Sequence, residues 1–228
     1  LDDVNAQGTQ KDLTLSVKGP AEFTSSLITD GTSMTFEDVV KVSVTDFRGD
    51  IVIKDGVEDL TIVNGVEVSF DNANALTTAD IAMVLDNDPI LTTENTAALP
   101  YGSKGDLTFA SMGDLTTLTI SGETGAISIT DCSNIETLNI SSKSDDLTID
   151  DNDDLITVNV ENAHFANVTV TGNGDLETLT LNHTTILTKS AKTAPTAVTA
   201  TISHNPKLET LTFGADKVKS LTVSNNAK

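Results

Sequence analysis

The stretch Leu147–Val160 reads LTIDDNDDLITVNV and places five polar side chains, DDNDD, between two short segments of alternating apolar residues. Carboxylate and amide oxygens are the ligands that Ca²⁺ prefers in proteins. The spacing of these five residues does not match the EF-hand loop, because no glycine follows at the required position. The stretch is therefore either a metal site of another kind or a turn that belongs to a larger repeat.

Catalytic chemistry has little support in this sequence. The three histidines, His164, His183 and His204, show no metal-ligand spacing, and neither G-x-S-x-G nor H-E-x-x-H occurs. We therefore expect no enzyme. A carbohydrate-active solenoid enzyme stays open as a lesser alternative, because such enzymes use carboxylates on one face. The scarcity of basic residues, the absence of Trp and the single Tyr argue against a sugar site.

Composition restricts the class of protein. The chain has 228 residues with 34 acidic and 13 basic side chains, a formal net charge of −21. Such a charge repels nucleic acid and anionic membranes, so we expect neither as a partner. No apolar run approaches the roughly 20 residues of a membrane helix, which argues against membrane insertion. The excess of acidic over basic residues suits an extracellular, cation-rich medium. The start at Leu1 suggests a processed N-terminus or an excised fragment.

Internal repeats organise the C-terminal half. The segments DLTTLTI (114–120), NIETLNI (134–140), DLITVNV (154–160), DLETLTL (175–181) and KLETLTF (207–213) share one pattern. Shorter alternating segments precede them at 107–109, 127–129, 147–149, 168–170 and 200–202, always six residues from the last apolar residue to the next repeat's first. Alternation of this kind is typical of strands with one buried face. The sequence therefore predicts an all-β fold, a β-solenoid of roughly 20-residue two-stranded coils.

The turns between these segments align into columns. One column holds Met112, Cys132, Asn152, Asn173 and Asn205, which we expect to point inward as an asparagine ladder. Two further columns hold the candidate metal ligands, with Asp131 and Asp151 in one and Asp114, Asp154 and Asp175 in the other, where Asn134 interrupts the acids. Stacked coils bring equivalent residues to about 4.8 Å, where carboxylates repel unless a cation bridges them. Ca²⁺ in these columns and a simply solvated acidic turn both remain open.

The rest of the chain divides less clearly. Residues 1–70 form an N-terminal β region, in which the solenoid starts near Val39 or a small β-sandwich stands alone. Residues 71–106 read as an insertion with one short helix over 77–85, after a Thr/Asp start signal. Residues 107–228 are the solenoid repeats, with a second insertion at 182–197. Because VSNNAK (223–228) stops in mid-repeat, we expect the natural protein to continue beyond Lys228.

The repeat L-x-I-x-x-[N/C]-x-x-L-x-x-L-x-I resembles the leucine-rich repeats of bacterial surface antigens, most closely at 132–140, CSNIETLNI. The departure is a second strand where such repeats carry a helix. In composition the chain also resembles bacterial surface-layer and matrix proteins, which are acidic, rich in Thr and β-structure, and calcium-dependent. That resemblance implies a self-assembling cell-surface protein, a lattice or filament of identical copies stabilised by Ca²⁺. Its contacts would use the solenoid edges and inserted loops, with cell-surface polysaccharide as a further partner.

Two features keep another class of function open. The TLT segments (117–119, 178–180 and 210–212) resemble the outward T-x-T ranks of ice-binding β-solenoids, although Asn139 and Asn159 interrupt them. The tripeptide RGD (48–50) matches an integrin-binding motif where a turn is expected. The alternative to self-assembly is therefore an adhesin or ice-binding module.

Overall fold

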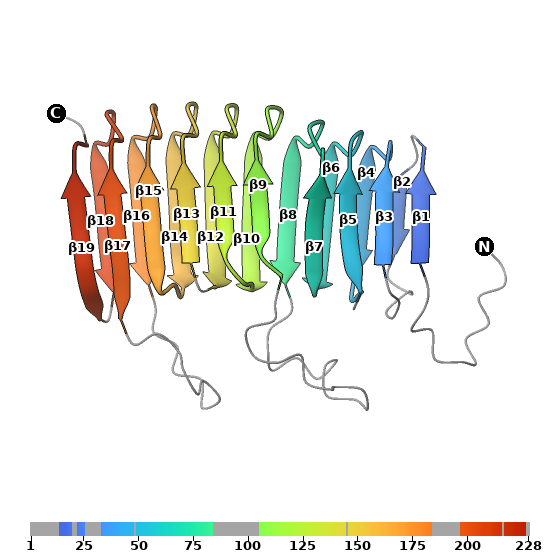
Figure 1. Ribbon diagram of the computed structural model, residues 1–228, viewed down its shortest axis with the longest axis horizontal. Helices are drawn as coiled ribbons and strands as arrows, with labels where there is room; N and C mark the ends of the chain where they lie inside the picture. Colours follow the sequence, from blue (N-terminus) through green and yellow to red (C-terminus); the bar gives the residue numbers. More distant parts are fainter. Residues whose placement is uncertain are drawn as a thin grey trace.

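The computed structural model describes residues 14–19, 22–25, 33–47, 49–83, 105–144, 146–183, 197–215 and 217–226. These residues fold as an all-β solenoid whose strands are stacked along one axis (Figure 1). Each coil contributes one odd-numbered strand to one face and one even-numbered strand to the other. The expected fold class is confirmed.

The even-numbered strands form one continuous parallel sheet of nine strands. They are β2 (Glu22–Ser25), β4 (Lys41–Thr45), β6 (Asp59–Gly65), β8 (Thr78–Met83), β10 (Thr117–Glu123), β12 (Thr137–Lys143), β14 (Thr157–Ala163), β16 (Thr178–His183) and β18 (Thr210–Ala215).

The odd-numbered strands form two sheets, one of four strands and one of six. The four-stranded sheet holds β1 (Thr14–Lys18), β3 (Ser33–Glu37), β5 (Asp50–Lys54) and β7 (Glu67–Asp71). The six-stranded sheet holds β9 (Leu107–Ala110), β11 (Ile127–Thr130), β13 (Asp146–Asp150), β15 (Asn167–Thr171), β17 (Val198–Ser203) and β19 (Val218–Ser224).

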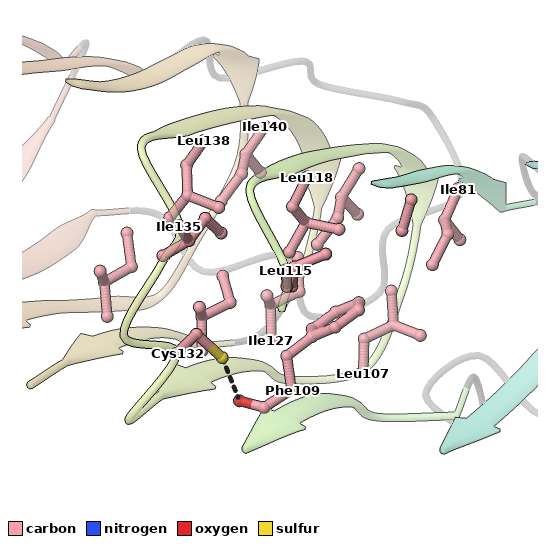
Figure 2. Packing of buried hydrophobic residues seen from close by; sticks show 14 of the residues in the cluster. Ile81, Leu107, Phe109, Leu115, Leu118, Ile127, Cys132, Ile135, Leu138 and Ile140 are labelled. Carbon is pink, nitrogen blue, oxygen red and sulfur yellow. Dashed lines mark hydrogen bonds between the residues drawn. The ribbon is translucent and has the colours of Figure 1, made fainter. Parts of the chain in front are cut away.

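The core lies between the two faces and follows the alternation of the sequence. On the even-numbered strands, Leu118, Leu138 and Val158 pair in register and are fully buried. Side chains such as Leu107, Phe109 and Ile127 meet them from the odd-numbered strands (Figure 2). Each coil thus adds a thin apolar layer to the layer before it, which is how a chain with seven Phe and no Trp fills its interior.

The strands begin later in the main repeat segments than the sequence pattern predicts, and they extend past the ends of those segments. In 134–140 the strand β12 begins only at Thr137, and Ile135 belongs to the preceding turn, where it is fully buried. Leu115, Leu155 and Leu176 lie at the equivalent turn positions and are also fully buried. The six-residue interval therefore reflects a turn with an inward apolar side chain of its own.

The predicted helix over 77–85 is wrong. Residues 78–83 form β8, in which Ala79, Ile81 and Met83 point inward and Asp80 is exposed. Apolar residues alternate along β8, and β8 pairs with both β6 and β10. These pairings outweigh the local helix signal. No helix occurs in the described residues, and accordingly none is long and apolar enough to span a membrane.

The N-terminal half belongs to the same solenoid, so the separate β-sandwich is excluded. The stack begins with β1 and β2, earlier than the expected start near Val39. Of the expected insertion at 71–106, residues 71–83 belong to a regular coil, and 84–104 lie outside the described residues. In the second insertion, 182–183 end β16 and 184–196 lie outside the described residues.

Candidate functional site

The upper turns follow the odd-numbered strands and lie at the top of Figure 1. The first residue of the turn has a positive φ, 54° at Asp131 and 52° at Asp151. Left-handed backbone favours Gly, Asn and Asp over most other residues, because their side chains tolerate it. The same conformation recurs at the equivalent positions of other coils: Asp38, Asn72, Ser111, Gly172, His204 and Asn225. The left-handed backbone conformation alone therefore explains why Asp occurs at positions 131 and 151.

In the coils that carry Asn152, Asn173 and Asn205, the next residue of the upper turn builds the predicted asparagine ladder. Asn152, Asn173 and Asn205 have no exposed surface. The Oδ1 of Asn173 accepts hydrogen bonds from the backbone N–H and the Nδ2 of Asn152, both at 3.1 Å. The Nδ2 of Asn173 donates to the carbonyl oxygens of Thr171 at 2.9 Å and Ile149 at 3.3 Å. The ladder is confirmed, and Asn152 is a structural residue, not a metal ligand on the surface.

Cys132 takes the ladder position in the next coil toward the N-terminus. Its backbone N–H donates to Asn152 Oδ1 at 3.0 Å, and its Sγ lies 3.7 Å from the carbonyl oxygen of Phe109 (Figure 2). Burial raises the pKa of this thiol. Hydrogen bonds lower the pKa by less, and the charge of Asp131 raises it by less. A buried thiol that stays protonated is unreactive, so Cys132 serves packing.

The first acidic column brings Asp131 and Asp151 to neighbouring coils, where both side chains are exposed. Asp150 lies beside them at the end of β13. Burial raises the pKa of Asp150, and the charges of Asp151 and Asp131 raise it further. Asp151 and Asp131 therefore repel a charged Asp150 carboxylate, and among the described residues no basic side chain forms an ion pair with these three acids.

The second acidic column is partly neutralised. Asp154 and Asp175 lie on neighbouring coils, and Lys207 on the following coil bonds Asp175 Oδ1 at 2.6 Å. Asp114 is exposed but is separated from Asp154 by the coil that carries Asn134. The sequence did not assign Lys207 to this column, although KLETLTF shows it at the Asp175 position.

These columns do not complete a metal site within one chain. Among the described residues, no group of three or more His, Cys, Asp or Glu side chains could hold a metal ion. Ca²⁺ takes roughly six to eight oxygen ligands, more than two neighbouring carboxylates provide. The described residues of these two columns therefore do not by themselves provide the coordination shell of a Ca²⁺ ion.

The outward face of the nine-stranded sheet carries straight ranks of hydroxyl groups. Strand pairing places Thr117, Thr137, Thr157, Thr178 and Thr210 in one register column. The central column of the same strands reads Thr119, Asn139, Asn159, Thr180 and Thr212, and Asn159 Nδ2 donates to Asn139 Oδ1 at 3.2 Å. The T-x-T ranks are thus in register at both ends of this stretch and are interrupted by two amides between them.

A groove of about 300 Å³ crosses the same sheet over β4, β6, β8 and β10. It contains Lys41, Asp59 and Asp80 among threonines, and Thr78 Oγ1 donates to Asp59 Oδ1 at 2.5 Å. The sequence did not indicate this group, because the shorter turns of the N-terminal coils hide which of their polar residues lie side by side. Register places Lys41 beside Asp59, and Asp80 beside Thr61, so an alignment of these coils would have found it.

A buried polar corner lies where β10, β12 and β14 end. Glu123 is 7% exposed and accepts a 3.1 Å ion pair from Lys143 Nζ, while His164 pairs with Lys143 through the backbone. Thr124 and Ser142 share a 3.2 Å hydrogen bond in the same corner. These contacts pair Glu123 with Lys143 and Thr124 with Ser142 inside the stack, and His164 is buried beside Lys143. His204 lies in an upper turn beside Asn225, away from this corner.

The RGD tripeptide is only partly defined, since Arg48 lies outside the described residues. Gly49 is buried and Asp50 begins β5, where it pairs with Ser33 and Glu67. Asp50 is thus part of a strand.

A scan against protein-family models, a search of curated proteins and a search of solved structures each find no match to this chain. The arrangement of residues in the coils is therefore the basis on which a function is proposed.

Proposed function

We propose that this chain is a structural, extracellular subunit of a cell surface or matrix, whose copies associate into a lattice or filament. Support comes from the regular stack of parallel coils, which presents the same polar groups at regular intervals along its length. The observation that carries the proposal is the acidic edge formed by the upper turns. There Asp131 and Asp151 follow each other on neighbouring coils, and their charges raise the pKa of Asp150.

We infer that Ca²⁺ acts between copies in this assembly. The described residues of one chain provide too few converging oxygens for the ion, so we expect a second acidic edge to face the first. Unbridged, two such edges repel each other, because each copy carries a net charge of −21. Bridging cations would turn this repulsion into adhesion, with cell-surface polysaccharide as a further partner of the lattice.

Electron microscopy of the purified chain tests the proposal. We expect ordered sheets or fibres with calcium, and their loss in excess EDTA. Magnesium is a stringent control, because it prefers near-ideal octahedral geometry and keeps its waters. Assemblies that persist unchanged in EDTA would refute the calcium role, and monodisperse monomers under every condition would refute self-assembly.

Ice binding is the second candidate, supported by the register of the threonine ranks on the nine-stranded sheet. A thermal-hysteresis assay separates it from self-assembly at once. Thr178→Val and Thr180→Val together should remove any activity, whereas Thr169→Val on the opposite face should not. Absence of thermal hysteresis in the wild-type chain rules the candidate out.

A carbohydrate-active enzyme remains the lesser alternative, supported by the groove with Lys41, Asp59 and Asp80. Two carboxylates at a glycosidic bond can act as acid and base or as acid and nucleophile. Release of reducing ends from polysaccharides, abolished by Asp59→Asn and Asp80→Asn, is the expected result for such an enzyme. Release that these variants leave unchanged would exclude this groove.

A further inference from the structure

The stack of odd-numbered strands is interrupted between β7 and β9. These two strands follow each other along the axis in Figure 1, yet they belong to different sheets. β7 pairs with β5 on its other side and β9 pairs with β11, while no pairing between β7 and β9 exists in the described part of the chain. The main-chain hydrogen bonds that join the other neighbouring odd-numbered strands are therefore missing at this place.

The nine-stranded sheet behind this place continues without a break. β8 pairs in register with β10, as it does with β6. Just before these strands, the carbonyl of Thr77 accepts the N–H of Thr116 at 2.9 Å. At their other end Gly122 lets β10 approach β8, because a Cβ at this position would collide with the carbonyl oxygen of Met83. The two parts of the stack are thus joined by strand pairing along one face only.

Side chains hold β7 against β9 on the other face. The rings of Phe70 and Phe109 meet with centroids 4.7 Å apart, and Phe109 is fully buried. Gly105 packs against Glu67, since a Cβ on that glycine would lie 3.0 Å from Glu67 Cγ. The interval between β7 and β9 is therefore closed by packing contacts, which can separate without breaking a strand pairing.

A groove of about 430 Å³ lies at this interval. Hydroxyl and amide side chains form part of its lining, among them Ser69, Asn72 and Thr108. Polar walls of this kind can keep their hydrogen bonds to water when the interval widens. The cost of opening therefore falls on the apolar side chains of the lining, such as Phe70 and Met112.

We propose that the interruption is a bending joint, at which the coils of β1–β8 and those of β9–β19 turn as two stiff segments about the β8–β10 pairing and the interval between β7 and β9 widens. In a solenoid each coil contacts only its neighbours, so a junction paired along one face is where the stack yields first. Bending lets one copy follow a curved surface with every strand pairing intact. The joint does not depend on the self-association proposed above.

Double electron–electron resonance between spin labels on introduced cysteines tests the proposal in the full 228-residue chain. Three label pairs are each separated by five strand steps, about 24 Å. The first pair crosses the joint on the odd-numbered face, the second crosses it on the even-numbered face, and the third lies beyond it on the odd-numbered face. The positions, in that order, are Val52 with Thr169, Thr61 with Thr180, and Thr108 with Thr222. Cys132 stays in place because it is buried, and the wild-type chain taken through the labelling checks that it does not react.

The first pair should give a broad distribution of distances with a component several ångströms longer than that of the closed interval. The second and third pairs should each give one narrow distribution, because strand pairing is continuous between their labels. Equal widths for the three pairs would overturn the proposal. A second pair as broad as the first would mean that the two segments separate on both faces, which would also overturn it.

Phe70→Ala removes the aromatic contact that closes the interval and should increase the long component of the first pair. Phe23→Ala is the matched control, because Phe23 meets Phe36 with centroids 4.9 Å apart near the start of the stack, away from the joint. An equal increase in the two variants, or no increase in Phe70→Ala, would contradict the proposal. The three label pairs without either substitution decide the matter even if one of these variants does not fold.

Discussion

The coils of β3–β8 and those of β11–β18 build the upper turn differently. Between odd-numbered strands the register advances by 17 residues from Asp50 to Glu67, but by 20 from β11 to β13 and by 21 from β13 to β15. The inward turn position is Val39, Val57 or Ala73 in the first group and Cys132, Asn152, Asn173 or Asn205 in the second, and all are at most 2% exposed. One fold thus tolerates an apolar column and a polar column on the same axis.

Turn length accounts for part of the difference. Val39 lies in a short turn, 38–40, between β3 and β4, and the Asp38 N–H bonds the carbonyl of Asp55 on the next coil at 2.8 Å. The turn at 151–156 is longer, and carbonyls such as those of Asp150 and Ile129 are bonded by Asn152 Nδ2, each at 3.1 Å. Buried carbonyls need partners, and Asn supplies them here, although Ala73, Met112 and Cys132 hold the same position in turns of this length.

The largest expected effect comes from breaking the polar column. Asn173→Ala removes the acceptor of two Asn152 groups and the donor to Thr171 and Ile149. Several buried groups then lack partners, at about 1–3 kcal/mol each, so the free energy of unfolding should fall by about 3–5 kcal/mol. Denaturant unfolding measures this.

Asn159→Ala is the matched control for that variant, because Asn159 is an outward amide one coil away. We expect a loss below about 1 kcal/mol. Equal losses in the two variants would mean that the ladder adds nothing beyond surface hydrogen bonding.

The reverse exchange should also destabilise the chain. Val57→Asn places an amide in the apolar column, where the short turn provides no free carbonyls, and should cost about 2–3 kcal/mol. Val63→Asn, at a position 38% exposed, should cost less than about 0.5 kcal/mol. A Val57→Asn variant as stable as wild type would show that the two columns are interchangeable.

Substitutions at Asp151 separate its backbone role from its charge. Asp151→Ala forces an Ala into φ near 52° and should cost about 1 kcal/mol. Asp151→Asn keeps a residue that tolerates this conformation and should cost little or stabilise slightly. Thermal unfolding of the pair checks this, and equal losses would assign the effect to the charge.

The smallest effect is a pH dependence at Asp150. Its folded-state pKa is raised above 3.8, chiefly by burial and then by Asp151 and Asp131, so the folded state holds this proton more tightly than the unfolded state. The group therefore destabilises the fold increasingly as pH rises through its folded pKa, and not at all below 3.8.

Asp150→Asn removes that penalty. The variant should be slightly more stable than wild type at pH 7 and no more stable near pH 3, in paired thermal melts. A gain of the same size at both pH values would mean that charge repulsion in this column is not its source.

The sequence predicted the C-terminal coils because Leu, Ile and Asn recur at fixed intervals there. Leu118, Leu138 and Asn173 are placed as expected. The N-terminal coils were harder to predict because their turns are shorter and lack the Asn, so the start of the stack at β1 and β2 was missed. β8 was taken for a helix because a local start signal says nothing of the pairing on both sides.

The candidate site was only partly predictable. Columns of Asp could be read from the alignment, but the positive φ that explains Asp131 and Asp151 is a property of the folded turn. The Lys207 partner of Asp175 and the groove between β7 and β9 depend on how the coils stack. No local sequence pattern indicates that the sheet of odd-numbered strands is interrupted.

Sedimentation velocity across a calcium titration tests the central proposal most directly. It compares wild type with a variant carrying Asp131→Asn, Asp151→Asn, Asp154→Asn and Asp175→Asn. The control changes Asp50, Asp80, Asp106 and Asp146, exposed acids away from the upper turns, to Asn and so loses the same charge. We predict large calcium-dependent species for wild type and control and none for the first variant. Equal assembly of the first variant and wild type, or no assembly by any of the three chains, would contradict the account.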